Sequence, residues 1–466
     1  MGIDDKIFEK EKIIKLLFKF AIPAIISLLV SELYNMVDTV FVGRYVGPNA
    51  IAALTVVFPI QRFLTSIGML IAVGTSTYVS RSLGKKDLIE IRKIIVSAFI
   101  ITLTFIIATS SFIFIIKKPL LYKLGASSLS FYLANEYIKV ILFGSIFQCL
   151  SLVLCNIMTS LGNANMTIYA TSIGAILNII LDYILVVNMG IGVKGAAIAT
   201  VISQIISCIF VFYKFRKVIN NFKIKFSIKC IKEALDKNLI QGIIAIGFST
   251  FIVEISDAIV AVILNNLLYS TGGDSAIIIV GIVTKVSMFM FIAIIGISSA
   301  MQPIAAYNFG AKKFNKVKKT VSLSIEIVTI TSLVFFIIIN LFATKIIGFF
   351  LQDKEILYST VKALRICIFL LPLTGVYYIA IYYYQAIKEA KKSFLLSIFR
   401  QLIAFIPLAI IFVELLGTIG VWIAYPVSDA ISTILSIYLL RKSPKKEVKI
   451  NVNTITNKTI LLNKIS

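Results

Sequence analysis

The sequence contains no histidine, a single tryptophan, five cysteines and only 15% charged residues. Without histidine the chain lacks the commonest general base, the central member of a Ser-His-Asp triad and the usual zinc ligand. The cysteines form no CxxC pair, and Cys149, Cys155 and Cys208 lie in apolar runs, so we expect buried free thiols. These absences argue against an enzyme and against a resident cofactor.

Apolar residues dominate what is present. They make up 59% of the chain and give it a mean hydropathy of +0.98, whereas a water-soluble domain is nearer about 45–50% apolar. A membrane-spanning helix needs roughly 20 mostly apolar residues. We therefore predict an all-α polytopic membrane protein with twelve transmembrane helices, near residues 14–40, 51–79, 94–116, 130–160, 166–188, 195–213, 239–265, 276–306, 321–342, 357–385, 394–413 and 418–440.

The formal net charge is +24, and its distribution along the chain is uneven. The termini and every second predicted connection carry 32 Lys and Arg residues, against 7 in the alternate connections. This asymmetry predicts that both termini are cytoplasmic in a multi-pass protein of the cell membrane. Because this excess faces anionic lipid, it does not call for a nucleic-acid partner. The N-terminal segment lacks a signal-peptide cleavage site, so we expect it to be retained.

The two halves of the chain resemble each other. The segment 78–87 ("YVSRSLGKKD") matches 305–314 ("AAYNFGAKKF"), which places Gly84 on Gly310 at an offset of 226 residues. The segment 191–204 matches 416–429, which places Gly195 on Gly420 at an offset of 225 residues. Each half holds six predicted spans, so the repeats run parallel, as in transporters that have two rocking lobes. We predict an N-lobe over 1–225 and a C-lobe over 226–466, with an amphipathic cytoplasmic linker over about 214–238 and a cytoplasmic tail over 441–466.

The glycines Gly190-x-Gly192-x-x-Gly195 resemble a dinucleotide-binding fingerprint. That motif also requires an Asp or Glu about 20 residues further on, and no acidic residue occurs between Tyr183 and Lys232. We therefore interpret the glycines as a turn outside the membrane between two spanning helices.

Acidic residues within the spans are costly, at about 2.5–3.5 kcal/mol for an Asp at mid-membrane, and so indicate function or pairing. Asn178 and Asp182 are four residues apart and share a helix face, as do Tyr34 and Asp38. Carboxylate, amide and hydroxyl oxygens suit a hard monovalent cation. Two close carboxylates also suit a shared proton. The alternative is that these groups only form interhelical hydrogen bonds.

Several segments together resemble the MATE (multidrug and toxic compound extrusion) family, in its MepA-like bacterial branch. They include "PAIISLLVSELYNMVDTVFVG" (23–43), "IYATSIGAILNIILDYILV" (168–186), "GVKGAAIATVISQ" (192–204), "MQPIAAYNFGAKK" (301–313), "SIFRQLIAFIPLAIIF" (397–412) and "GVWIAYPVSD" (420–429). The resemblance covers nearly all of 14–440. It implies two six-helix lobes around a central cleft, and export of cationic or amphipathic drugs in exchange for H⁺ or Na⁺ by alternating access.

The resemblance also implies site residues. It assigns the coupling cation, H⁺ or Na⁺, to Asp38, Asn178 and Asp182, with Thr200 as a further ligand and Tyr34 as a neighbour. In the C-lobe it points to Glu254 on the seventh helix, and we add Asp257, Gln302 and Tyr377 as substrate candidates. Some family members also use an acid on the tenth helix, and "LPLTGVYYIAIYYYQ" (371–385) has none. For the basic residues Lys285 and Arg400 we expect snorkelling or pairing with an intramembrane acid.

A rival reading is a flippase for lipid-linked oligosaccharides of the same superfamily. That activity predicts a cavity lined with basic residues, whereas acids occupy the first, fifth and seventh spans here. We expect a monomer that contacts membrane lipid.

Overall fold

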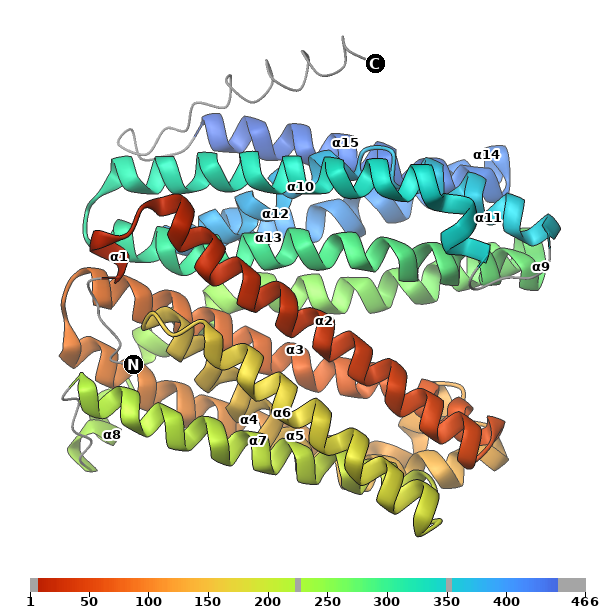
Figure 1. Ribbon diagram of the computed structural model, residues 1–466, viewed down its shortest axis with the longest axis horizontal. Coiled ribbons are helices and arrows are strands. Elements are labelled where there is room, and N and C mark those ends of the chain that lie inside the picture. Colours follow the sequence, from red (N-terminus) through yellow and green to blue (C-terminus); the bar gives the residue numbers. More distant parts are fainter. Residues whose placement is uncertain (1–6, 223–227, 349–353, 443–466) are drawn as a thin grey trace. The chain divides into compact units, whose positions relative to one another are not determined.

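The computed structural model describes residues 7–222, 228–348 and 354–442, and every regular element in those ranges is a helix. The elements are α1 (Ile7–Lys10), α2 (Ile13–Tyr45), α3 (Pro48–Gly84), α4 (Leu88–Lys123), α5 (Ser128–Ser160), α6 (Asn165–Asp182), the π-helix η1 (Tyr183–Asn188), α7 (Val193–Asn221), α8 (Ile228–Ala234), α9 (Lys237–Gly310), α10 (Phe314–Gly348), α11 (Lys354–Cys367), α12 (Leu371–Ala386), α13 (Ala390–Ile398), the π-helix η2 (Phe399–Phe405), α14 (Ile406–Leu416) and α15 (Thr418–Arg441). Figure 1 shows their arrangement.

Within the described residues, eleven helices are long and apolar enough to cross a membrane. A twelfth span is completed by α11 and α12, which are bent by 48° at a short break. Pro372 stands at the start of α12, where its missing N–H is tolerated. The predicted seventh and eighth spans are joined in α9, with a non-helical kink at Gly273. The prediction of an all-α protein with twelve spans is confirmed, and the chain is a multi-pass membrane protein.

Contacts divide the described part of the chain into two compact units, which lie within residues 1–10 with 26–255 and within residues 11–25 with 256–466. In the first unit, α3 packs against α4 and α5, α5 packs against α7, and α7 packs against α6. In the second unit, α12 packs against α10, α13 and α15. Every residue of α12 except Leu373 is buried. The sequence-based lobe boundary near residue 225 stays a prediction.

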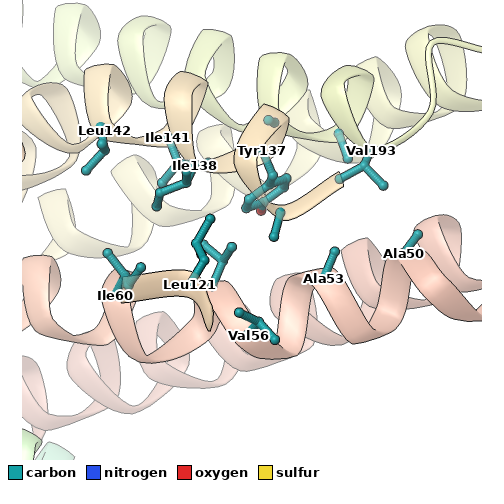
Figure 2. Close-up of a cluster of buried hydrophobic side chains, with 14 of the residues drawn as sticks. Ala50, Ala53, Val56, Ile60, Leu121, Tyr137, Ile138, Ile141, Leu142 and Val193 are labelled. Carbon is teal, nitrogen blue, oxygen red and sulfur yellow. The ribbon is translucent and has the colours of Figure 1, made fainter. Parts of the chain in front are cut away.

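An apolar core closes one end of the first unit, where α2, α4 and η1 end and α3, α5 and α7 begin. Figure 2 shows Val56 and Ile60 of α3 facing Tyr137 and Ile138 of α5, with Leu121 among them. Val42, Val186 and Val201 belong to the same cluster. Buried apolar surface contributes about 25 cal/mol per Å² in water. Inside a bilayer, close packing of this kind is what holds helices together.

The internal duplication is visible in the backbone. Positive φ angles recur at a spacing of 225 or 226 residues, in the pairs Gly47 (111°) and Gly273 (59°), Lys86 (62°) and Lys312 (58°), Gly162 (96°) and Lys388 (69°), and Gly192 (71°) and Gly417 (64°). The turn after α3 is closed by hydrogen bonds from Asp87 N to Ser82 O and from Lys86 N to Leu83 O. The turn after α9 has the same pattern. These are Schellman helix ends, and they confirm the repeat inferred from the sequence.

The glycine motif forms a turn, as predicted. Gly190 and Gly192 have φ angles of 64° and 71°, which L-residues with side chains rarely adopt. Gly195 lies inside α7, where a Cβ atom would come 3.1 Å from Leu185 O. The motif therefore connects η1 to α7 and serves close packing.

The described part of the predicted linker is helical except at Phe222, Leu235 and Asp236. Its segment α8 packs against α4, with Ser97 Oγ donating to Ala234 O at 2.5 Å and Arg92 Nη2 lying 3.5 Å from Glu233 Oε2. Residues 223–227 of this linker, and all of the predicted tail beyond Lys442, lie outside the described residues. All five cysteines are buried and free, which confirms the expectation for the thiols.

Candidate functional site

Two carboxyl groups meet inside the first unit. Asp38 lies on α2 and is 8% exposed, and Asp182 is the last residue of α6 and is fully buried. The two carboxyl groups lie within hydrogen-bonding reach of each other. The Oδ1 atoms of both residues are buried and find no hydrogen-bond partner among the described residues. The pair therefore retains two oxygen atoms that a proton or a small cation can satisfy.

An ordered chain of hydrogen bonds leads to this pair. Tyr34 OH donates to Thr200 Oγ1 at 3.3 Å. The Asn178 amide is oriented with its nitrogen towards Asp182. The nitrogen donates to Asp182 Oδ2 at 2.9 Å, and the Asn178 amide oxygen accepts from Thr200 Oγ1 at 3.3 Å. The Thr200 hydroxyl then accepts from Tyr34 and donates to Asn178, so every donor in the chain meets an acceptor. The arrangement fixes the Asp182 carboxyl group in position and leaves its Oδ1 available.

Local structure explains how these residues converge. Asn178 and Asp182 are one helical turn apart on α6 and are both fully buried, so they face α7, which packs against α6 and carries Thr200. The π-helix η1 starts directly after Asp182, and such bulges are frequent at functional sites. All five residues predicted for the N-lobe site thus come together from three helices. Their role in binding a cation stays a prediction.

The acid pair borders the apolar core of the first unit. Val42 follows Asp38 by one turn, and Val186 follows Asp182 by one turn, and both belong to that core. Tyr137 is also buried there, and its hydroxyl accepts from Gln61 Nε2 at 3.5 Å. An ion that approaches the carboxyl groups from this end of the unit would have to displace tightly packed side chains.

The four C-lobe candidates each contact a different partner. Glu254 Oε2 lies 3.8 Å from Arg62 Nη1, and Asp257 Oδ1 accepts from Gln401 Nε2. The buried Gln302 donates to Gln385 Oε1 at 2.8 Å. Tyr377 is 2% exposed and donates to Leu396 O at 2.8 Å. Their proposed role in substrate binding stays a prediction.

The expected pairing of Arg400 is confirmed. Its Nε lies 2.7 Å from Asp429 Oδ1, and both side chains are buried. The guanidinium also lies over the rings of Phe291, Tyr377 and Tyr378, at 5.2, 6.0 and 6.0 Å from their centroids. This pair neutralises an intramembrane acid of the second unit.

Arg62, a charged residue within the spans, was missed in the sequence. Arg62 lies in the middle of α3 and contacts both Glu32 and Glu254. A single basic residue between apolar runs was the available signal, since such a residue requires a partner in the membrane. The described residues contain no group of three or more Asp, Glu, Cys and His side chains placed to hold a metal ion.

Comparison with known proteins identifies the family of the chain. Residues 23–184 and 245–411 match the family model described as MatE. The chain belongs to the MatE family. The first matched stretch contains Asp38, Asn178 and Asp182, and the second contains the C-lobe candidates, whereas Thr200 lies between them.

MatE proteins from bacteria are among its relatives. The multidrug export protein MepA of Staphylococcus saprophyticus is 27% identical over 440 residues, which cover 93% of this chain and 95% of that protein. MepA of Staphylococcus aureus is 27% identical over 443 residues with the same coverage.

Solved structures of related transporters share the fold. One is an outward-facing conformation of a multidrug resistance MATE family transporter of the MOP superfamily, with a TM-score of 0.87, 25% identity, and coverage of 94% of this chain and 97% of that one. Another is a MOP superfamily transporter from Pyrococcus furiosus, for which reverse polarity of the binding pocket suggests a different function. It has a TM-score of 0.86, 25% identity, and coverage of 93% and 96%.

Proposed function

We propose that this protein is a secondary active multidrug exporter that removes organic cations and other amphipathic drugs in exchange for H⁺ or Na⁺. The observation that carries the proposal is the buried Asp38–Asp182 pair with one unpartnered oxygen on each carboxyl group. A site of this kind changes its charge when it takes up or releases one cation. The names of the staphylococcal relatives support drugs as the cargo.

In the proposed cycle, the Asp38–Asp182 pair takes up a cation from outside as drug leaves, and releases it inside before drug binds. Asn178 and Thr200 orient the Asp182 carboxyl group, and Tyr34 orients Thr200. One positive charge that crosses 100 mV yields about 2.3 kcal/mol, enough to sustain roughly a fifty-fold gradient of an uncharged drug. Exchange of one monovalent cation for a monocationic drug moves no net charge, so that export is driven by the concentration gradient of H⁺ or Na⁺. We infer no further cofactor and no enzymatic step. We also infer that the protein works as a monomer and that both termini are cytoplasmic, because of the Lys and Arg asymmetry.

Gradient-driven efflux tests this proposal. Proteoliposomes loaded with ethidium receive an imposed pH or Na⁺ gradient, and efflux is compared between wild type and Asp38→Asn. We expect Asp38→Asn to lose the gradient dependence because an amide cannot carry the exchanged charge. Glu414→Gln, which changes an exposed acid on α14, is the matched control and should export as wild type does.

Two results would contradict the proposal. Asp38→Asn that responds to the gradient as wild type does would remove Asp38 from the coupling. A wild-type protein that exports no cationic dye but flips lipid-linked oligosaccharides would instead support the flippase reading.

A further inference from the structure

The triad of Glu32, Arg62 and Glu254 joins three helices of the first unit. Arg62 Nη2 lies 3.4 Å from Glu32 Oε1, and Arg62 Nη1 lies 3.8 Å from Glu254 Oε2. The side chains of Arg62, Glu32 and Glu254 are 33%, 25% and 28% exposed, respectively. One guanidinium therefore divides its two ends between two acids, which lie on α2 and α9.

The geometry of this triad is loose. Charge-assisted N–H···O contacts are typically about 2.7–2.9 Å, and Arg often grips one carboxylate with two parallel bonds. Here Arg62 makes one long contact to each acid. The Arg400–Asp429 pair of the same protein shows the contrast, because its contact is 2.7 Å and its side chains are only 9% and 2% exposed. Arg62 is thus held by attraction from two sides rather than locked onto one partner.

Aromatic rings lie beside the triad. Arg62 Cζ lies 5.1 Å from the ring centroid of Phe58, one turn earlier on α3. Phe63 packs edge-on against Phe251 at 6.1 Å, and Phe251 stacks on Phe248 at 5.6 Å. Phe58, Phe63 and Phe248 are 48%, 38% and 37% exposed. Exposed ring faces next to carboxylates attract flat or apolar cations.

We propose that Arg62 is a specificity-determining residue for transport. Its guanidinium occupies Glu254 in the free protein, and an arriving organic cation displaces it from Glu254. Glu32 holds the closer contact and keeps Arg62 in place while Glu254 changes partner. With all three groups ionised, the triad has a net charge of −1, which one monovalent cation neutralises. Arg62 therefore favours monocations over dications. This inference rests on the proposed function, since it assigns a selectivity to the same transport path.

Binding measurements test the selectivity directly. Equilibrium dialysis of the purified full chain in detergent measures the Kd of the monocation tetraphenylphosphonium and of the dication methyl viologen. Arg62→Gln should bind the monocation about two- to fivefold more tightly, the size expected for one partly exposed ion pair. The affinity for the dication should rise by roughly the square of that factor. The ratio of the two Kd values therefore shifts about two- to fivefold in favour of the dication.

Three further variants control the experiment. Arg62→Lys keeps the charge and should keep the wild-type ratio. Lys85→Gln removes a positive charge just beyond the end of the same helix, where Lys85 pairs with Glu90, and should also keep it. Glu254→Gln should shift the ratio the opposite way, because the triad then has no net charge. Because Glu254→Gln changes a different residue, it tests the proposal even where Arg62→Gln does not fold.

The outcomes separate this inference from the proposed function. Wild type that exports cationic dye, combined with an unchanged ratio in Arg62→Gln or in Glu254→Gln, overturns the role of Arg62 and leaves the exporter intact. Equal gains for Lys85→Gln would also overturn it, because the effect would then be a general one of net charge. Wild type that neither binds nor exports any cation overturns both.

Discussion

Replacing Arg400 and replacing Asp429, which form a buried pair, should destabilise the second unit by different amounts. At 2.7 Å and an effective dielectric constant of about 20, the attraction between the two charges is about 6 kcal/mol. Desolvation of both ions offsets most of this. Removing one partner is nevertheless costly, because the other charge is then left buried. Arg400→Met should therefore cost about 3–5 kcal/mol of the free energy of unfolding.

Asp429→Asn should cost less than Arg400→Met. The Arg400 guanidinium keeps three aromatic neighbours, Phe291, Tyr377 and Tyr378, and each such contact contributes roughly 0.5–2 kcal/mol. We therefore expect a loss of about 2–3 kcal/mol for Asp429→Asn, given the usual 3–5 kcal/mol for a broken buried pair. The double variant Arg400→Met with Asp429→Leu should lie within about 2 kcal/mol of wild type, because no charge remains buried.

Equilibrium unfolding in mixed micelles with a rising fraction of SDS measures these values. The single tryptophan, Trp422, is buried on α15 two turns before Asp429, so its fluorescence reports on the region that changes. Losses in the double variant equal to the sum of the two single losses would refute the reasoning. So would a larger loss for Asp429→Asn than for Arg400→Met.

Two backbone predictions use the same unfolding assay. Gly247→Ala should destabilise the protein by about 2 kcal/mol or more, within the range of overpacking changes, because the added Cβ would collide with the backbone of Leu70. Gly281→Ala, where a Cβ meets nothing within 4 Å, should be neutral or stabilising by up to about 1 kcal/mol. Lys388→Gly should stabilise by roughly 1 kcal/mol, because Lys388 adopts a φ of 69°, whereas Lys391→Gly in helix α13 should destabilise by a similar amount. A loss at Lys388 or no loss at Gly247 would contradict these assignments.

The sequence was sufficient for the N-lobe site because its key residues are local to each helix. A four-residue spacing places Asn178 and Asp182 on one face whatever the helix packs against, and the same holds for Tyr34 and Asp38. The family resemblance then supplied the pairing of these helices. The mutual contact of Asp38 and Asp182, which lie 144 residues apart in the sequence, needed the tertiary structure.

The triad of Glu32, Arg62 and Glu254 could not be predicted from the sequence for the same reason. Its partners Glu32 and Glu254 lie on different helices, and no spacing rule connects three separate helices. The sequence predicts that Arg400 pairs with an acid, because a basic residue in the membrane requires an acidic partner. It does not predict that the partner is Asp429 rather than Asp257, because that choice depends on the register of α15 against η2. The bend between α11 and α12 was likewise hidden, because the apolar pattern continues across it.

The duplication kept the backbone of the turns and let the charges diverge. Positive φ angles recur in both halves because each turn must close a helix end, whatever the side chain, so Lys388 occupies the strained position that Gly162 fills in the first repeat. Intramembrane charges follow another rule, since each is costly without a partner. At the repeat spacing, Leu264 and Pro407 stand where Asp38 and Asp182 stand in the first repeat. The acid that the second repeat does bury, Asp429, is neutralised by Arg400. A carboxyl pair with oxygens left for an exchangeable cation thus belongs to the first repeat, which explains why the proposed coupling is placed there.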